Sequence, residues 1–198
     1  MIDGVFEDNF DRKELGPDWF STAPAGAYTI RDSRLCTNQP KNHPLWLKKK
    51  LPVNVSIRFH ATALSPQGDI KAEFFGSGCS FDSAGGEYSS TGYVGVLGAH
   101  NNTEHWLARL AEHGPDTKIK ADLLEQGLIS ESKVVANHDY QFELRRRDGK
   151  TIEYIVDGVT IHELEDSAPL SGKDHDHFAF DGWVPPVCFD NLVIQKLP

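Results

Sequence analysis

Apolar and polar residues alternate in short runs along most of the chain, and no stretch shows the period of a long helix. The clearest run, VNVSIRFHATAL, sets Val53, Val55, Ile57 and Phe59 against Ser56, Arg58, His60 and Thr62. Successive side chains of a strand point to opposite faces, so this period of two predicts strands that bury one face. Roughly a dozen such runs predict an all-β fold, an antiparallel β-sandwich with at most one short helix.

The two ends of the chain carry a similar phrase, an aromatic residue followed by an acid. VFEDNFDR at 5 to 12 and VCFDNLVIQKL at 187 to 197 predict terminal strands that lie side by side. Asp148-Gly149 and Asp157-Gly158 predict hairpin turns. The best candidate for the short helix is ADLLEQGLI at 121 to 129.

The charge balance narrows the partners. The chain has 20 basic and 29 acidic side chains and a net charge of −9, which disfavours nucleic acid and anionic membrane surfaces. LKKK at 47 to 50 and RRR at 145 to 147 are interpreted as solvated strand edges that discourage association between sheets. No linker interrupts the sequence, so we expect one domain over residues 1 to 198, with the oligomeric state left open.

Three cysteines, Cys36, Cys79 and Cys188, are too few and too scattered for a disulfide framework or a zinc site. We therefore expect reduced, mostly buried thiols. The start, MIDGVFEDNF, has neither a basic segment nor an apolar stretch of the kind that signal peptides use. These features predict a cytoplasmic protein as given, or a secreted or periplasmic one if a signal was removed.

Three segments carry a resemblance to a known superfamily: GDIKAEFFG, the stretch from GYVGVLG to LARLAEHG, and the FDNLVI ending. They resemble the concanavalin A-like lectins and glucanases in their small laminin-G-like bacterial form, and within it jelly-roll domains related to the 3-keto-disaccharide hydrolases. The resemblance implies a jelly roll with a carbohydrate-facing sheet. The paired-glutamate motif of the laminarinase-type members is missing, because HELED at 162 to 166 has Leu164 where the aspartate should be.

The resemblance also bears on metals. Members of the superfamily often tie their terminal strands with a structural calcium ion, and the acids near the two ends of this chain that would hold one are Asp3, Asp11 and Asp190. No other cofactor is expected. A divalent metal held by His175 and His177 with Asp181 or Glu73 stays open as an alternative, since H-x-H in a strand directs both rings to one face.

A carbohydrate-binding surface is predicted from the residues that alternate away from the core. An indole stacks on the apolar face of a sugar, and charged or amide groups hydrogen-bond its hydroxyls. The predicted substrate-binding residues are Trp46, Lys71, Asn101, Arg109, His175, His177 and Trp183.

Hydrolysis of a glycosidic bond usually needs two carboxyl groups, and histidine is the natural proton carrier near neutral pH. The predicted catalytic residues are Glu73, Glu112 and His113. The leading hypothesis is a jelly-roll protein that binds a saccharide on one sheet and, if it is an enzyme, hydrolyses the glycosidic bond of a small saccharide or keto-sugar.

Two alternatives remain. One is a non-catalytic, lectin-like module that uses Trp46 and Trp183, and the other is a polysaccharide lyase that uses Arg109, His113 and Tyr93. Phosphate-binding loops, nucleophile elbows and dinucleotide fingerprints are absent from the sequence, which removes most support for nucleotide chemistry and serine hydrolysis.

Overall fold

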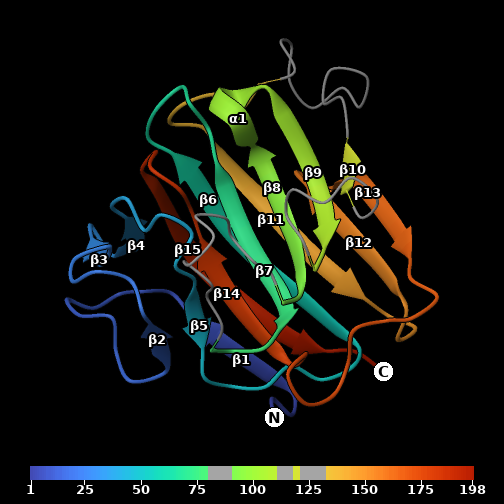
Figure 1. Cartoon of the computed structure of the whole chain (residues 1–198). Helices are drawn as coiled ribbons and strands as arrows, with labels where there is room; N and C mark the ends of the chain where they lie inside the picture. The colour runs from blue at the N-terminus through green and yellow to red at the C-terminus, as the bar shows by residue number, and fades with distance from the viewer. Residues whose placement is uncertain (80–90, 111–117, 121–132) are drawn as a thin grey trace.

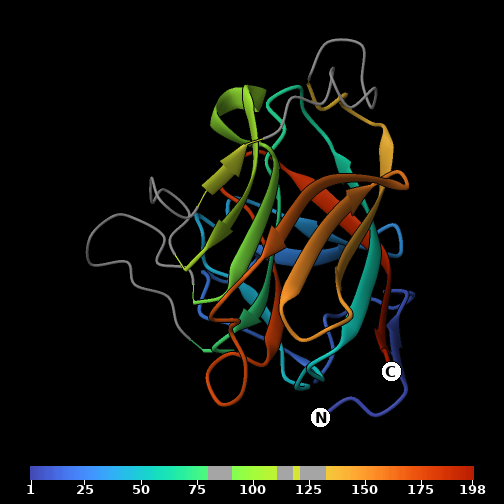
Figure 2. The same cartoon turned by 90° about the vertical axis from the view of Figure 1, so that its right-hand side faces the viewer.

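Two antiparallel sheets pack face to face in the computed structural model, which describes residues 1 to 79, 91 to 110, 118 to 120 and 133 to 198 (Figures 1 and 2). The first sheet has eight strands in the order β13 (Val159–Glu165), β12 (Thr151–Val156), β11 (Asp139–Arg146), β6 (Val55–Ala63), β15 (Val187–Lys196), β4 (Arg34–Thr37) and β3 (Tyr28–Arg31), with β1 (Val5–Asp8) paired to β15. The second has seven, in the order β10 (Lys118–Lys120), β9 (Glu104–Arg109), β8 (Tyr93–Gly98), β7 (Ile70–Gly76), β14 (His177–Asp181), β5 (Leu45–Leu47) and β2 (Trp19–Ser21). The predicted antiparallel β-sandwich is confirmed.

Aromatic rings fill the space between the sheets. Phe59 of β6 meets Phe180 of β14 with ring centroids 5.2 Å apart, and Phe180 stacks on Phe189 of β15 at 4.2 Å. Phe59 lies at one of the alternate positions that the sequence pattern assigned to the core. Apolar burial of this kind is the main favourable contribution to folding.

Strand pairing at the two ends of the chain follows the prediction. β1 pairs with β15 from Val5 opposite Gln195 to Asp8 opposite Leu192. The two termini therefore lie at the same end of the sandwich (Figure 1).

The two predicted hairpin turns are also confirmed. Asp148-Gly149 joins β11 to β12 and Asp157-Gly158 joins β12 to β13. Asp157 and Gly158 both adopt positive φ, 49° and 80°, which is the conformation of a type I′ hairpin turn.

A short helical turn, α1 (Ala99–Asn102), lies between β8 and β9. Its residues His100, Asn101 and Asn102 have positive φ. The buried Asn102 amide donates to the carbonyls of Pro66 and Val134 at 3.0 and 2.7 Å, which fixes the turn. The predicted helix at 121 to 129 lies outside the described residues. Within the described ranges, no helix is long and apolar enough to cross a membrane.

The prediction of reduced thiols is wrong for two of the three cysteines. Cys36 and Cys188 form a disulfide between directly opposed positions of β4 and β15, while Cys79 is free and exposed. The two partners are 152 residues apart. Sequence spacing does not show that β4 and β15 are neighbours, so the pairing was invisible before the strand order was known.

Two side chains face the core against expectation. Arg146, the middle residue of RRR, is 0% exposed; its guanidinium lies 3.4 Å from the centroid of the Phe75 ring and donates to the carbonyls of Val53 and Leu170 at 2.6 and 2.7 Å. Burial lowers the pKa of Arg146 to about 10. Phe75, which strict alternation after the core residue Phe74 would turn outward, also lies in the core, because its φ of 56° breaks the alternation at the end of β7.

Candidate functional site

Two cross-strand rows of side chains cover the outer face of the seven-stranded sheet, the face that points away from the shared core. The first row runs through Trp46, Ala179, Glu73, Val94 and Ala108. The second runs through Asp181, Lys71, Val96 and Trp106. The strand alternation inferred from sequence thus brings three predicted site residues, Trp46, Lys71 and Glu73, onto one face of one sheet.

These residues are buried, contrary to the expectation of an open surface. Trp46 and Lys71 are each 2% exposed, Glu73 is 1% exposed, and Asp181 is 0% exposed. An ionised group out of water costs free energy unless its surroundings compensate it. Three ionisable side chains on neighbouring positions of two strands are therefore a candidate site on physical grounds.

Glu73 is held by Thr91, a residue that the sequence did not single out. The Thr91 backbone N–H and hydroxyl both donate to Oε1 of Glu73 at 2.9 Å. A Cβ on Gly76 would lie 2.5 Å from the same oxygen and 2.4 Å from Cη2 of Trp46. The carboxyl and the indole therefore both pack against the backbone of Gly76, where only glycine leaves room for them.

Lys71 and Asp181 stand directly opposite each other on β7 and β14. The Lys71 ammonium donates to Oδ1 of Asn42 at 2.8 Å, and Asp181 accepts the Gly182 backbone N–H at 2.7 Å. The Asn42 backbone N–H in turn donates to the carbonyl of Gly182 at 2.9 Å. The segment around Asn42 is thereby fixed beside the end of β14, and Asn42 joins the site as a residue that the sequence pattern missed.

Glu73 and Asp181 are diagonal neighbours, because Glu73 pairs with Ala179 and Asp181 with Lys71. Diagonal positions on adjacent antiparallel strands are roughly 7–8 Å apart. Retaining glycosidases hold their two carboxyl groups roughly 5–5.5 Å apart and inverting ones roughly 6.5–9.5 Å apart, so diagonal positions are compatible with a catalytic pair. The sequence analysis named Asp181 as an alternative metal ligand. It did not identify Asp181 as the second carboxyl group of a catalytic pair.

His175 and His177 flank the Glu73 end of the face. The ring of His175 contacts the Thr91 carbonyl through Nδ1 at 2.9 Å, so the same residue that holds Glu73 also holds His175. Nδ1 of His177 lies 2.7 Å from Asp176, which also pairs with Lys50 at 2.6 Å. Burial lowers the pKa of His177, with Asp176 acting in the opposite direction.

Trp183 and Asn101 lie toward the opposite end of the sheet. Trp183 is 45% exposed, and its backbone N–H donates to Asp69 at 2.8 Å. The Asp69 N–H donates to the Gly98 carbonyl at 2.9 Å, next to α1, where Asn101 is exposed. Of all the predicted indoles, Trp183 is the one available to solvent for stacking.

The structure does not bring Arg109 to this face. Arg109 lies opposite Tyr93 on the side of the sheet that faces the core, and it pairs with Asp166 at 2.7 Å. The Tyr93 hydroxyl also donates to Asp166 and is 0% exposed; burial, together with this hydrogen bond, raises the pKa of Tyr93 to about 12. A lyase base at Tyr93 therefore loses its support. Glu112 and His113 lie outside the described residues.

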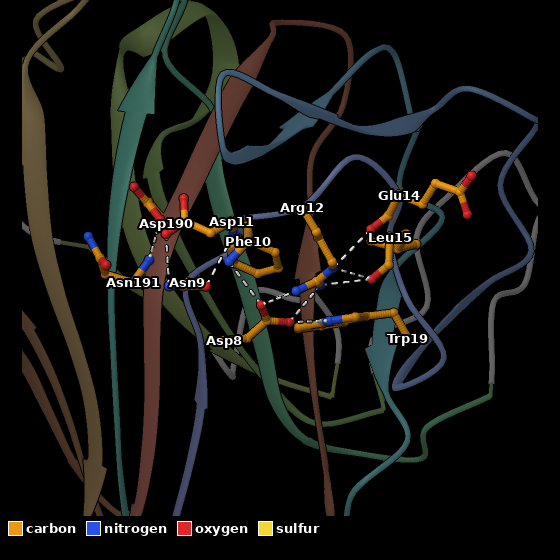
Figure 3. Close-up of polar contacts among 10 residues, drawn as sticks. All are labelled: Asp8, Asn9, Phe10, Asp11, Arg12, Glu14, Leu15, Trp19, Asp190 and Asn191. Atoms are coloured by element: carbon orange, nitrogen blue, oxygen red, sulfur yellow. Dashed lines mark hydrogen bonds and ion pairs between the residues drawn. The ribbon is translucent and has the colours of Figure 1, made fainter.

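The three acids suggested for calcium do not converge. Asp3 pairs with Lys196 at 2.8 Å near the start of β1, whereas Asp11 and Asp190 lie near each other beyond the other end of that strand (Figure 3). Burial raises the pKa of Asp190, and the nearby Asp11 adds to the effect. In the described part of the chain, no three His, Cys, Asp or Glu side chains are placed to hold one metal ion, so these residues fit neither the calcium ion nor the histidine metal site.

Asp8, beside this pair, is a buried carboxylate with a complete set of partners (Figure 3). It accepts hydrogen bonds from the Phe10 backbone, from both terminal nitrogens of Arg12 and from the Trp19 indole. Burial acts to raise the pKa of Asp8, but these donors hold it below its ordinary value. Because Trp19 belongs to the other sheet, Asp8 joins the two layers and serves the fold.

Comparison with known proteins adds the fold class. No protein-family model matches the chain, and no curated protein matches it in sequence. Among solved structures, it is similar to the carbohydrate-binding module CBM66 from Bacillus subtilis, with a TM-score of 0.63 and 10% identity over 92% of this chain and 98% of that one.

Two further structures show the same fold with different described activities. A putative glycosyl hydrolase from Parabacteroides distasonis has a TM-score of 0.60 and 12% identity, covering 98% of this chain and 94% of that one. The alginate lyase Aly36B, solved with an alginate trisaccharide, has a TM-score of 0.62 and 10% identity over 100% of both chains. The sheet order, the shared core and these likenesses together identify the fold of this chain as a concanavalin A-like jelly roll.

Proposed function

We propose that this protein binds a saccharide on the outer face of the seven-stranded sheet. The observation that carries the proposal is the set of three buried ionisable side chains, Lys71, Glu73 and Asp181, beside the Trp46 indole. The three polar groups can hydrogen-bond the hydroxyls of a sugar, and Trp183, the exposed indole toward the other end of the sheet, can stack on its apolar face. The structures similar in fold include a carbohydrate-binding module and a lyase complex with a trisaccharide.

Glycosidic hydrolysis is the reaction that this arrangement favours. Thr91 donates two hydrogen bonds to one oxygen of Glu73, an arrangement suited to an ionised carboxylate, so we assign Glu73 the role of proton acceptor or nucleophile. Asp181, the diagonal neighbour, is then the second carboxyl group that the reaction needs. Lys71, opposite Asp181, would hydrogen-bond a substrate hydroxyl or carbonyl. The expected substrate is a small saccharide or keto-sugar.

A binding-only, lectin-like module is the second candidate. It is favoured by Trp183, which is 45% exposed and could stack on a sugar without any chemistry. The two candidates differ in what Glu73 does, since a lectin needs it only as a hydrogen-bond acceptor.

A screen of native and 3-keto disaccharides, read for both binding and turnover, tests the proposal. Glu73→Gln should lower turnover by about 10²–10⁴-fold, the usual contribution of an acid–base group, while leaving the unfolding transition in place. Glu163→Gln is the matched control, because Glu163 is exposed on β13 of the other sheet and lines none of its hollows. Unchanged turnover in Glu73→Gln would remove Glu73 from the mechanism, and binding without turnover in the unmodified protein would favour the lectin-like candidate.

The disulfide bears on the compartment. We place the protein in an oxidising environment, secreted or periplasmic, because the Cys36–Cys188 bridge would be reduced in an ordinary cytoplasm. Mass measurement of alkylated protein taken directly from each compartment should find two blocked cysteines where the bridge exists. Three alkylated cysteines in the native compartment would contradict this placement.

A further inference from the structure

A polar groove crosses the outer face of the eight-stranded sheet, on the side of the molecule away from Glu73. It consists of three hollows of about 480, 420 and 420 Å³. The central hollow shares Arg58 and Glu143 with one neighbour and His60 and Asn191 with the other. The hollows are therefore continuous, and the outward residues of β6 form their floor.

A β-bulge opens the middle of this groove. The pairing of β15 with β6 shifts register between Asp190 and Val193, and Asn191 in the bulge has a φ of 50°. Asn191 and Val193 line the central hollow beside Arg58 and His60. Bulges of this kind often re-aim side chains next to binding sites. Nine residues of β6, at about 3.3 Å each, give the groove a length of about 30 Å, which suits an extended chain.

The groove is more positive than the rest of the protein. Its lining includes four arginines, Arg34, Arg58, Arg145 and Arg147, and three acids, Asp139, Glu143 and Asp190. The whole chain, by contrast, has a net charge of −9. An anionic group that the remainder of the surface repels meets a local excess of guanidinium groups here.

Two of these arginines are open to a ligand. Arg145 is held by Glu153 through two hydrogen bonds of 2.7 and 2.8 Å, but Arg58 is exposed, and its polar contact with Gln195 is a long 3.5 Å. Among the described residues, no carboxylate lies within ion-pair distance of Arg58. Arg147 is 60% exposed and 3.6 Å from Glu153. Guanidinium groups offer paired donors that match the oxygens of a carboxylate or sulfate.

The other residues that line the groove favour a ligand that carries hydroxyl groups along its length. Gln141, Gln195 and Asn191 offer amides, and Asp139 and Asp190 offer carboxylate acceptors. A phosphodiester chain presents few hydroxyl groups to these amides and carboxylates, whereas a saccharide presents several on every unit. We propose that this groove is a second binding site, for an extended saccharide that bears oxyanion groups, carboxylate or sulfate, with Arg58 and Arg147 as the anion contacts. The proposal is independent of the Glu73 site.

Calorimetry with oligogalacturonate as the probe tests this site. Arg58→Gln and Arg147→Gln should each weaken binding of oligogalacturonate about tenfold. The fully methyl-esterified probe has lost its charges, so its binding to the unmodified protein should be no tighter than the binding of oligogalacturonate to these variants. Arg31→Gln is the matched control, an exposed arginine on β3 of the same sheet outside the groove. It should bind as the unmodified protein does, and so should Glu73→Gln, which isolates this site from the first one.

The same calorimetry with a sulfated oligosaccharide shows whether the groove prefers sulfate or carboxylate groups. Binding of either anionic probe that depends on Arg58 supports the groove and names its preferred group. Binding that Arg58→Gln leaves unchanged, equal binding of the methyl-esterified probe, or no binding of either anionic probe would overturn the proposal. Amide shifts on titration should appear along β6 and β15, and shifts confined to β7 and β14 would also count against it.

Discussion

The outer faces of both sheets carry ionisable side chains, but those of the eight-stranded sheet reach solvent and those of the seven-stranded sheet are buried. On the eight-stranded sheet, Arg145 and Glu153 form a cross-strand ion pair with side chains 20% and 17% exposed, and Arg58 is exposed. On the seven-stranded sheet, Lys71, Glu73 and Asp181 are all at most 2% exposed. Charges that reach water cost little and contribute little. Charges that are withdrawn from water must be compensated by partners, and apolar residues of similar size are often at least as stable there.

The difference teaches where to look for chemistry in this molecule. If the outer face of the seven-stranded sheet served only the packing of the fold, apolar residues could occupy all of it. Val94, Val96 and Ala108 do occupy part of it. Lys71, Glu73 and Asp181 interrupt that apolar surface. We therefore interpret the interruption as functional and the exposed face as a solvated surface with a binding groove.

Replacing Lys71 should have the largest effect on stability. Lys71→Met removes the ammonium opposite the buried Asp181 carboxylate, and loss of one partner from a buried pair typically costs about 3–5 kcal/mol. Arg58→Met on the other face should stay within about 0.5 kcal/mol. Denaturant unfolding of both variants measures the comparison.

The double variant Lys71→Met/Asp181→Asn should recover much of that loss, since it removes the uncompensated charge as well. A loss in Lys71→Met no greater than that in Arg58→Met would show that burial does not distinguish the two faces.

Breaking the disulfide comes next in size. Cys36→Ala/Cys188→Ala should lower the free energy of unfolding by about 2–4 kcal/mol, because the bridge no longer restricts the unfolded chain. Binding at the seven-stranded face should be unchanged, since the bridge joins strands of the other sheet. Equilibrium unfolding with and without a reducing agent gives the measurement.

Cys79→Ala, which removes the free thiol, is the control and should leave stability unchanged. Equal stability of the unmodified protein in oxidising and reducing buffers would contradict the expected contribution of the bridge.

Asp8 gives the smallest expected effect and a pH signature. Asp8→Asn should cost about 1–3 kcal/mol at neutral pH, because it weakens the hydrogen bonds from Arg12 and Trp19. The folded-state pKa of Asp8 is lowered from an ordinary value of 3.8. The stabilisation is therefore complete above about pH 4 and is lost as pH falls through the folded-state pKa.

The stability gap between the unmodified protein and Asp8→Asn should accordingly narrow in acid. Unfolding measured from pH 7 to pH 2 checks this, with the exposed Asp174→Asn as control. A gap that stays constant through this range would mean that Asp8 is not an ionised structural group.

Much of the fold was accessible from sequence because its signals are local. Alternation identified β6 and the faces of β5, β7 and β14, and the Asp-Gly pairs identified two hairpins. The same parity brought Trp46, Lys71 and Glu73 onto one face, although their roles there remain predictions.

What the sequence did not show depends on contacts between distant segments. The Cys36–Cys188 bridge and the burial of Arg146 required knowledge of which strands are neighbours and of what covers a given position. Thr91 and Asn42 carry no motif and enter the site only through their hydrogen bonds to Glu73 and Lys71. Arg109 was predicted at the site from its residue type, whereas strand register turns it toward Asp166.

The central position of β15 has a consequence for how the protein is made. This strand is synthesised after all the other described strands, yet it lies between β6 on one side and β1 and β4 on the other. Until it emerges from the ribosome, the β6 edge has an unfilled row of backbone donors and acceptors, which is a known route to aggregation. Translation that pauses before residue 187 should therefore leave a nascent chain that depends on chaperones.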